Sequence, residues 1–364
     1  MSAQLPQSTR PPKRVLVIVT RRIGDVLLAT PVFRSLRRAW PDASVDALVF
    51  SGTAAALAGN PDINQVHAIA ERPPLLQHLK FIAQLFRRYE LAVSLVAGDR
   101  PTLYAYAAGQ KRVGLLLPTQ KEAWKRRFLN HWAPYELGEQ HTVLTHLSVL
   151  TLLNVQPIAE LAAPQQDDAS AQAALASLQG RRYVVLHPYP KFNYKTWSTA
   201  GWLALARWLH GKGLGVVLTG GNDATERAYV AALAVEMPSA LNLAGELSLC
   251  ATTAVIARAV AYVGPDTATT HIAAALDVPM VTFFGPTDPL KWGPWPKGRD
   301  ATVSPWRRLG DQARGNIRLL QGAAMCAPCG NEGCKRHIES VSDCLHALPA
   351  SRVISALCEV ANIE

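Results

Sequence analysis

Short apolar runs of strand length alternate with longer segments of helical periodicity along most of the chain. The first run, residues 14–20 (RVLVIVT), is followed by a segment whose apolar residues recur at helical spacing. Apolar strands separated by helices are typical of a parallel sheet covered on both faces. In the first half we expect strands at Arg14–Thr20, Ser44–Phe50, Val66–Ala70 and Leu91–Ala97, and helices at Asp25–Trp40, Leu75–Tyr89 and His141–Leu153.

The alternation is interrupted at residues 156–168 (QPIAELAAPQQDD), which contain two prolines and several polar residues. Such a break is typical of a domain linker. We therefore place a disordered tail at 1–13, a first domain at 14–160 and a second domain from 161 onward, both doubly wound α/β domains. The second domain is expected to contain strands at Tyr183–His187, Gly215–Thr219, Leu241–Ala244, Ala261–Val263 and Met280–Phe284, and helices at Thr199–His210, Ala224–Val235, Ala251–Ala259 and Thr267–Leu276.

Composition limits the class of protein. The chain has 364 residues, 49% hydrophobic and 18% charged, which is enough apolar material for two packed cores and excludes disorder over most of its length. No apolar run reaches the ~20 residues that span a bilayer. The first residues are polar and proline-containing and lack the apolar stretch of a secretory signal, so we expect a cytoplasmic protein.

The net charge of +10 is concentrated in the first half, where residues 1–160 carry 19 Lys and Arg against 11 Asp and Glu. A basic surface of this kind favours a polyanionic partner, such as nucleic acid, anionic lipid or a phosphorylated sugar. Ordinary solvated helix faces are the alternative for any single pair. The positions are Arg34, Arg37, Arg38, Arg87, Arg88, Lys111, Arg112, Lys125, Arg126 and Arg127.

The loop after the first strand carries the first candidate site. Arg21, Arg22, Gly24 and Asp25 lie where an α/β protein binds its ligands, at the carboxyl end of a strand. Gly24 allows close approach of a ligand to the backbone. Asp25 is suited to act as a general base, and capping of the following helix is an equally open interpretation.

Loops after the strands of the second domain carry the remaining candidates. Lys191 and Lys195 offer compact positive charges that suit a diphosphate. Glu226 could accept hydrogen bonds from ribose hydroxyls, although with Asp223 it also fits a capping box. Asp266, Thr267 and His271 belong to the block GPDTATTH, which joins a short strand to a helix and is dense in hydrogen-bonding groups.

Four of the six cysteines are close together in sequence, at Cys326, Cys329, Cys334 and Cys344. Their spacing is similar to a metal knuckle but fits no standard zinc finger. A small thiol-rich turn that packs on the core is the alternative, and we expect no metal. A phosphate-binding GxxxxGK[ST] loop, a dinucleotide fingerprint and a GxSxG elbow are absent from the sequence.

Taken together, these motifs resemble glycosyltransferase family 9, the ADP-heptose:lipopolysaccharide heptosyltransferases. The segments that carry the resemblance are RVLVIVTRRIGDVLLATP from Arg14, Lys195-Thr196-Trp197, GPDTATTHIAAALDVP from Gly264, FGPTDP from Phe284 and the cysteine segment Cys326–Leu345. The resemblance implies a GT-B fold with two Rossmann-like domains that face a central cleft. It also implies that the second domain ends near residue 350 (161–350) and that a final helix in 351–364 packs back on the first domain.

The resemblance also assigns roles. Asp25 matches the family's base, and the first domain would bind the acceptor through Arg21, Arg22 and Gly24. For the donor, Lys195, Glu226, Leu247, Asp266, Thr267 and His271 match positions of the family, with Leu247 near the adenine. Lys191 stands where the family often has hydroxyl residues, and its charge makes it a further donor-binding candidate. The implied activity is inverting, metal-independent transfer of a heptose or related sugar from a nucleotide sugar, ADP-heptose, to a lipopolysaccharide inner-core acceptor, without cofactor. The acceptor would be a phosphorylated, lipid-linked oligosaccharide at the inner face of the inner membrane, contacted peripherally.

Two other functions remain open at this point. A GT-B-fold nucleotide-sugar epimerase would use the same donor without an acceptor. A non-catalytic module that binds polyanions would explain the basic first half, but it would not need the donor-site residues of the second half.

Overall fold

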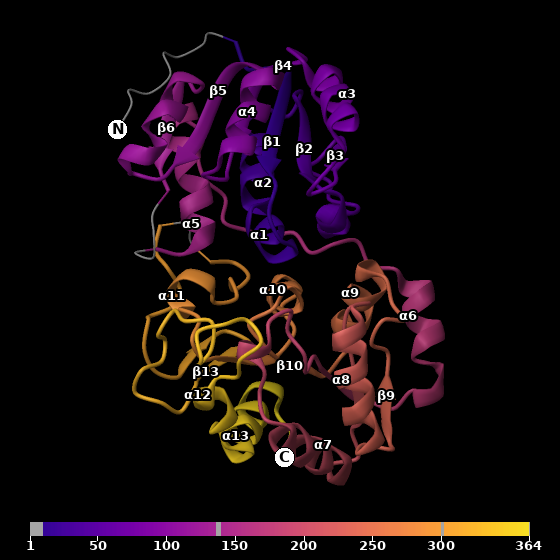
Figure 1. The fold of residues 1–364 in the computed structure, drawn as a ribbon. Helices are drawn as coiled ribbons and strands as arrows, with labels where there is room; N and C mark the ends of the chain where they lie inside the picture. Colours follow the sequence, from indigo (N-terminus) through magenta and orange to yellow (C-terminus); the bar gives the residue numbers. More distant parts are fainter. Residues whose placement is uncertain (1–9, 136–139, 300–301, 364) are drawn as a thin grey trace. The chain divides into compact units, whose positions relative to one another are not determined.

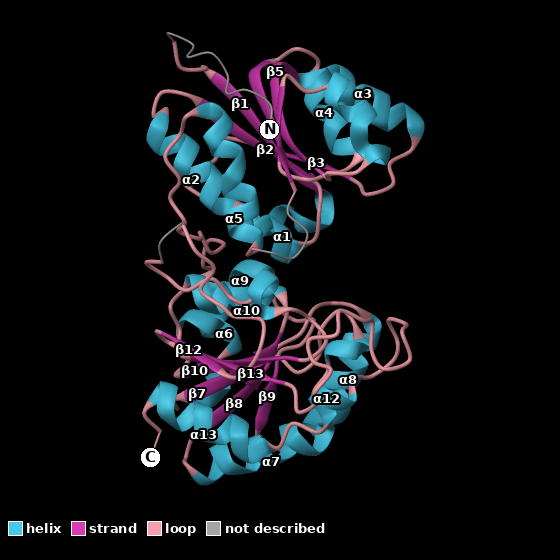
Figure 2. Cartoon of the chain, turned by 90° about the vertical axis from the view of Figure 1, so that its left-hand side faces the viewer, coloured by secondary structure: helices cyan, strands magenta, loops and turns pink. Residues whose placement is uncertain are grey.

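The computed structural model describes residues 10–135, 140–299 and 302–363, and the chain divides into two compact units. Unit 1 comprises Met1–Pro164 with Gly298–Ser304, and unit 2 comprises Gln165–Lys297 with Pro305–Glu364. Each unit is a sheet with helices on both faces (Figures 1 and 2). Residues 1–9 of the expected tail lie outside the described residues.

Unit 1 contains six parallel strands in the order β3-β2-β1-β4-β5-β6. This is the Rossmann order, in which the direction of strand succession reverses between β1 and β4. Val15 to Val19 of β1 have no exposed surface, which explains why this strand is apolar on both faces. The strands are β1 Arg14–Val19, β2 Ser44–Phe50, β3 Val66–Ile69, β4 Tyr89–Ser94, β5 Gly109–Leu116 and β6 His131–Pro134.

Helices cover both faces of this sheet. Helices α3 and α4 pack on the face that carries Leu16, Ile18 and Leu48, and α1, α2 and α5 lie together on the other face (Figure 2). The single helix expected at residues 25–40 is two helices, because Pro31 lacks the N–H that would continue the ladder. The helices are α1 Ile23–Leu28, α2 Thr30–Ala39, α3 Leu75–Leu85, α4 Asp99–Ala108 and α5 Thr142–Leu147, with 3₁₀ helices η1 Ser51–Leu57, η2 Gln120–Arg127 and η3 Ser148–Leu153.

The segment expected as a linker is bound to helix α2. The Thr30 hydroxyl accepts a hydrogen bond from the Ala162 N–H at 3.0 Å, and the Ser35 hydroxyl accepts one from the Ile158 N–H at 2.8 Å. These bonds hold the segment against unit 1, so the boundary falls after Pro164 instead of after residue 160.

Unit 2 contains a seven-stranded sheet in the order β12-β13-β11-β10-β7-β8-β9. All pairs are parallel except β12 with β13. The strand order again reverses, here between β7 and β10. The strands are β7 Tyr183–Leu186, β8 Gly215–Leu218, β9 Ala240–Asn242, β10 Ala261–Pro265, β11 Met280–Phe284, β12 Gln312–Arg314 and β13 Ile317–Gln321.

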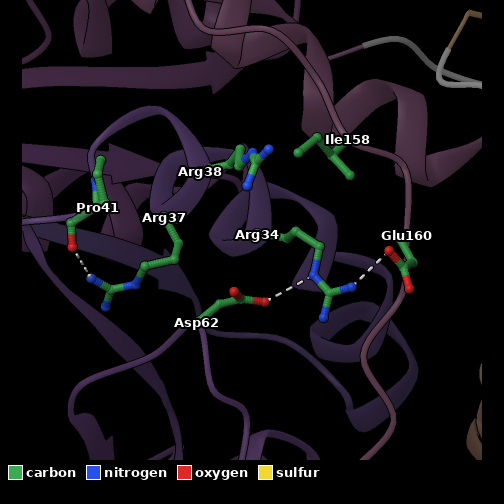
Figure 3. A pocket seen from close by; sticks show the side chains of 7 residues that line it. All are labelled: Arg34, Arg37, Arg38, Pro41, Asp62, Ile158 and Glu160. Atoms are coloured by element: carbon green, nitrogen blue, oxygen red, sulfur yellow. Dashed lines mark hydrogen bonds and ion pairs between the residues drawn. The ribbon is translucent and has the colours of Figure 1, made fainter.

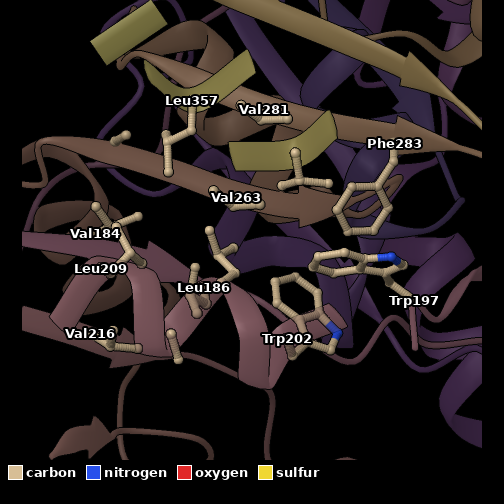
Figure 4. Close-up of a cluster of buried hydrophobic side chains, with 14 of the residues drawn as sticks. Val184, Leu186, Trp197, Trp202, Leu209, Val216, Val263, Val281, Phe283 and Leu357 are labelled. Atoms are coloured by element: carbon tan, nitrogen blue, oxygen red, sulfur yellow. The ribbon is translucent and has the colours of Figure 1, made fainter. Parts of the chain in front are cut away.

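Two buried tryptophans lie at the centre of the unit 2 core. Trp197 and Trp202 meet edge to face with ring centroids 4.9 Å apart, and both lie within 5.7 Å of the Phe283 ring (Figure 4). The helices of the unit are α6 Asp168–Ala174, α7 Thr199–Gly211, α8 Ala224–Val235, α9 Leu249–Ala257, α10 Ala268–Ala275, α11 Pro289–Trp292, α12 Asp343–His346 and α13 Ala350–Ala361, with 3₁₀ helices η4 Ala176–Leu178 and η5 Asn193–Lys195.

The final helix differs from the expectation that it packs on the first domain. Helix α13 contacts α7, β11 and β13, and its apolar side chains Val353 and Leu357 belong to the unit 2 core. Leu357, with no exposed surface, lies near Val281 in that cluster (Figure 4). The apolar stripe of α13 is therefore buried within unit 2.

Within the described ranges, no helix has the length and hydropathy needed to cross a membrane.

Candidate functional site

The carboxyl edge of the unit 1 sheet contains a cavity of about 320 Å³. Its walls come from the segments that follow β1, β2, β3 and β4, so it includes the point where the strand order reverses. Open α/β sheets bind ligands at this position. The lining residues are Thr20, Arg21, Phe50, Glu71, Arg72, Val96, Ala97, Gly98, Asp99, Arg100 and Pro101.

Asp25 lies in the first turn of α1, next to this edge. Its residue is 8% exposed, and its carboxylate Oδ1 lies 3.7 Å from the Arg21 guanidinium Nε. Arg21 also lines the cavity, so it connects the carboxylate to that space. Helix α1 begins at Ile23 with Arg22 as its N-cap, and Asp25 is the third helical residue. The capping interpretation of Asp25 therefore does not hold.

The charge of Asp25 affects the pKa of two groups, the half-buried Tyr135 and the buried His146. Burial raises the pKa of the Tyr135 hydroxyl and the Asp25 carboxylate raises it further, while Arg21 opposes both effects. Burial lowers the pKa of His146, against the opposing effects of the Leu28 carbonyl and Asp25. The His146 ring is therefore neutral at neutral pH. Asp25 is a largely desolvated carboxylate with a cation on one side, which suits a general base.

Sequence reasoning did not single out Arg72 and Arg100. Arg100 donates a hydrogen bond to the Glu71 carbonyl, and both arginines line the cavity with Arg21. Three arginines around one cavity favour an anionic ligand such as a phosphate group. Arg72 follows an expected strand and Arg100 follows another, so strand ends were the signal that could have identified them.

In unit 2 the structure brings together two residues that were predicted on separate loops. The Lys195 ammonium Nζ lies 2.5 Å from Asp266 Oδ2. Lys195 follows β7 and Asp266 follows β10, so the pair lies where the strand order of this sheet reverses. Both side chains are largely buried, with 19% and 10% of their surface exposed. Lys191, by contrast, is exposed.

Several hydroxyl groups lie close together in the segment after Asp266. The N-cap of α10 is Thr267, and Asp266, which precedes it, pairs with Lys195. The Thr267 hydroxyl lies 2.9 Å from that of Thr269, and the buried Tyr262 hydroxyl lies 2.9 Å from Thr269. His271 is 3% exposed on the same helix. Hydroxyl groups at a helix start can bind a sugar or a phosphate.

Glu226 is held by the loop that follows β8. Its Oε1 accepts a hydrogen bond from the Gly221 N–H at 2.6 Å, while Asp223 caps helix α8 alone. Glu226 thus does not close the expected capping box. Burial raises the pKa of Glu226, the Gly221 N–H opposes this, and Asp223 reinforces it. Its Oε1 lies 4.0 Å from His187 Nε2, and burial lowers the pKa of His187 to about 4.

Leu247 is half-buried in the loop between β9 and α9. It precedes Ser248, whose hydroxyl caps α9 by accepting a hydrogen bond from the Ala251 N–H. Lys195, Glu226, Leu247 and Thr267 therefore all follow strands of one parallel sheet and lie at its carboxyl edge.

The late cysteines are free thiols, with Cys344 buried and Cys326, Cys329 and Cys334 exposed. Burial, followed by the three neighbouring thiols, raises the pKa of Cys344 to about 11. Among the residues that the structure describes, no group of three or more His, Cys, Asp or Glu side chains has a geometry that could hold a metal ion.

A second cavity, of about 560 Å³, lies at the opposite edge of the unit 1 sheet (Figure 3). Burial lowers the pKa of Arg34 there, but its bonds to Glu160 (2.7 Å) and Asp62 (3.0 Å) more than offset this, so the pKa is raised. Arg37 donates to the Pro41 carbonyl at 3.1 Å. These two arginines stabilise the fold, so this cavity is a weaker candidate for an anionic ligand.

Comparisons with known proteins show the family to which the chain belongs. Residues 102–315 match the family model described as glycosyltransferase family 9 (heptosyltransferase). The chain is 30% identical over 285 residues to lipopolysaccharide heptosyltransferase 3 of Escherichia coli, covering 75% of this chain and 83% of that protein. It is 30% identical over 296 residues to lipopolysaccharide heptosyltransferase 1 of Pseudomonas aeruginosa, covering 76% and 79%.

Solved structures show the same fold. A glycosyl transferase family 9 protein from Veillonella parvula superposes with a TM-score of 0.78 at 17% identity, over 97% of this chain and 98% of that one. ADP-heptose lipopolysaccharide heptosyltransferase II of E. coli superposes with a TM-score of 0.73 at 19% identity, over 96% and 98%.

Two Rossmann-like units and the likeness to solved heptosyltransferase structures confirm the expected GT-B fold class. With its family match and its relatives at 30% identity, the chain belongs to glycosyltransferase family 9. It is therefore an enzyme that transfers a heptosyl group, and the non-catalytic alternative is wrong.

Proposed function

We propose that this chain transfers a heptosyl group from ADP-heptose to the phosphorylated inner core of lipopolysaccharide, with inversion at the anomeric carbon. The relatives named above support the sugar and the class of acceptor. The observation that carries the proposal is the Lys195–Asp266 pair, which puts a cation at the reversal point of the unit 2 sheet.

On the donor side, Lys195 binds the diphosphate and neutralises the charge that grows as the bond from the anomeric carbon to the diphosphate oxygen breaks. Asp266 contacts the same ammonium, so donor binding exchanges one anionic partner of Lys195 for another. Asp266, Thr267 and His271 then contact the sugar and the phosphates. Glu226 accepts hydrogen bonds from the ribose hydroxyls, backbone groups at Leu247 meet the adenine, and Lys191 adds a second positive charge nearby.

On the acceptor side, Asp25 removes the proton from the acceptor hydroxyl as its oxygen attacks the anomeric carbon. Gly24 and the arginines Arg21 and Arg22 bind the acceptor. The cavity at this edge adds Arg72 and Arg100, which suit phosphate groups on the inner core. Transfer therefore needs groups from both units. Because Lys195 supplies positive charge to the leaving diphosphate, the chemistry needs no divalent ion.

The acceptor is anchored in lipid, so we propose that the enzyme works at the cytoplasmic face of the inner membrane through peripheral contact. The basic first half agrees with an anionic surface.

Acceptor-dependent release of nucleoside diphosphate tests the proposal. The purified chain is incubated with ADP-heptose, other ADP-sugars and UDP-sugars, each with and without core-truncated lipopolysaccharide. We expect ADP release only when ADP-heptose and an inner-core acceptor are both present. Proton NMR of the product should show an anomeric configuration opposite to that of the donor. Epimerisation of a donor without any acceptor would instead identify an epimerase and overturn the proposal.

A further inference from the structure

Unit 1 exposes an apolar surface that none of the proposed catalytic residues explains. Seven of the twelve large hydrophobic residues that are exposed in the described chain lie between Leu75 and Trp124. Single exposed apolar side chains are ordinary, but a gathering of them marks an interaction site. We call this gathering the α3–η2 surface and define it by Leu75, Leu76, Leu79, Phe86, Tyr106 and Trp124.

Helix α3 has two apolar stripes. The inner stripe, which includes Phe81, Ile82 and Leu85, packs on the unit 1 core. The outer stripe consists of Leu75, Leu76 and Leu79, which are 73%, 66% and 54% exposed, and it continues to Phe86, which is 61% exposed. These four residues repeat at helical spacing and share one face. The fold of unit 1 therefore leaves a whole apolar helix face uncovered.

Aromatic contacts extend the stripe across α4 to η2. The Arg87 guanidinium lies over the rings of Phe86 (5.9 Å) and Tyr106 (6.0 Å). The Tyr106 ring packs edge to face on Phe128 at 5.1 Å, and Phe128 packs on Trp124 at 5.6 Å. The exposed rings of Phe86, Tyr106 and Trp124 are thus connected through the Arg87 guanidinium and the Phe128 ring.

The charge around this surface is strongly positive. Residues 72–132 contain eleven Lys and Arg but only three Asp and Glu. Two of the three carboxylates, Asp99 and Glu122, pair with the buried Lys125. The remaining one, Glu90, accepts a hydrogen bond from the Lys13 N–H. The exposed cations of this region therefore outnumber its carboxylates. These cations are Arg72, Lys80, Arg87, Arg88, Lys111, Lys121, Arg126 and Arg127.

We propose that the α3–η2 surface docks on an anionic lipid bilayer, with the outer stripe of α3 and Trp124 in the headgroup region. An apolar face bordered by Lys and Arg is the pattern of helices that lie in a membrane interface, and tyrosine and tryptophan are enriched there. A soluble polyanion would account for the cations but not for three exposed leucines on one face. The inference deepens the proposed function, on which it rests for the membrane location of the acceptor.

Vesicle binding by the full chain tests the proposal without donor or acceptor. Vesicles of phosphatidylcholine with phosphatidylglycerol are compared with vesicles of phosphatidylcholine alone. We expect binding to the anionic vesicles that weakens as salt is raised. The triple variant Leu75→Gln/Leu76→Gln/Leu79→Gln should lower the partition coefficient roughly tenfold or more, because each leucine contributes apolar burial. The variant Lys80→Gln/Lys111→Gln/Arg127→Gln should weaken binding mainly at low salt.

Matched controls come from unit 2. The variants Val235→Gln/Leu309→Gln/Met325→Gln and Arg182→Gln/Arg207→Gln/Lys297→Gln remove equally exposed groups and should bind as the wild type does. Circular dichroism checks that every variant folds. Transfer to a deacylated, water-soluble acceptor should be unchanged by the leucine substitutions, which separates docking from catalysis.

Equal binding of the wild type and the leucine variant would overturn the proposal, as would no binding of the wild type to either vesicle. If the wild type binds no vesicle and the leucine substitutions instead dissociate an oligomer in light scattering, the surface is an interface between copies of this chain. A chain that docks but transfers no heptose would refute the proposed function alone.

Discussion

The ammonium of Lys195 and the carboxylate of Asp266 lie 2.5 Å apart, although 71 residues separate them in sequence. They meet because β7 and β10 are neighbours in the unit 2 sheet and each residue follows the carboxyl end of its strand. A buried pair of this kind holds a cation in place and in a fixed orientation before an anionic ligand arrives.

We predict that Lys195→Ala raises KM for the donor and lowers kcat together. The contact with the diphosphate strengthens as the glycosidic bond breaks, so it acts on both constants. One charge-assisted hydrogen bond contributes about 1.5–3 kcal/mol, which corresponds to a loss of roughly 10- to 150-fold in kcat/KM. Steady-state kinetics measures both.

Lys191→Ala is the matched control, because Lys191 lies on the same loop but is exposed. It should have a smaller effect, and the double variant should lose more than either single one. Unchanged constants for Lys195→Ala would show that the diphosphate does not bind at this loop.

We predict that Asp25→Asn lowers the rate of transfer by ~100- to 10,000-fold and leaves donor affinity unchanged. Asparagine keeps the shape of the side chain but cannot accept a proton, and positioned bases contribute this much. Single-turnover kinetics and calorimetric titration with ADP measure the two quantities. Because Asp25 does not cap α1, stability should change little. Near-normal turnover in Asp25→Asn would exclude this carboxylate as the base.

The stability of unit 2 should fall as the pH is lowered from about 6.5 to 4. Burial lowers the pKa of His187 to about 4, so in this window the unfolded chain binds a proton that the native state does not. Stability therefore rises with pH here, and the loss on acidification is about 3 kcal/mol. The pKa of Glu226 is raised in the native state, so just above the ordinary carboxyl pKa the native state binds a proton that the unfolded chain does not. This lowers stability as the pH rises, which is opposite to the effect of His187. A substitution of His187 is therefore needed to separate the two effects.

Denaturant titrations of the wild type and of His187→Asn, measured at each pH, separate the contribution of His187 from that of Glu226. The difference in unfolding free energy between the two proteins should vary with pH across the window. A difference that is constant from pH 4 to 6.5 would contradict the assignment to His187.

We predict that the purified enzyme contains no stoichiometric metal and remains active in chelator. Among the described residues, no three His, Cys, Asp or Glu side chains are arranged to hold a metal ion, and Cys344 is buried while the other three late cysteines are exposed. Elemental analysis and transfer assays in the presence of EDTA check the two parts. Metal bound at one equivalent would refute the first part, and loss of transfer in EDTA the second.

Leu357→Ala tests the position of the final helix. Leu357 has no exposed surface within the unit 2 core, so the substitution should lower the unfolding free energy of unit 2 by about 2–5 kcal/mol. Ser355→Ala, on the exposed face of α13, is the control and should change little. If only the unfolding of unit 1 were affected, α13 would belong to that unit.

The sequence predicted strands such as β1 and β11, because nearly every residue in these runs is apolar and buried on both faces of the sheet. It missed β5, in which exposed Gln110 and Lys111 follow the first residue, and it merged α1 with α2 although Pro31 marked the break. Tertiary contacts decide such elements, and they are not visible in local periodicity.

The sequence identified candidate residues within single loops, but it did not show which of them contact one another. The sequence singled out both Lys195 and Asp266, but their contact depends on the order of the strands in the sheet. Arg72 and Arg100 were missed because their role depends on a cavity formed by four strand ends. On α3, periodicity predicted a helix but could not show which of its two apolar stripes is buried.

The uncovered stripe of α3 also has a consequence for the protein in solution. With Leu75, Leu76 and Leu79 exposed to water, molecules away from a bilayer can lower their free energy by burying these side chains against one another. The concentration at which the enzyme stays monodisperse is then set by one helix face and not by the stability of either core. Replacing these leucines with glutamine should raise solubility in lipid-free buffer, and a mild detergent should do the same for the unaltered chain.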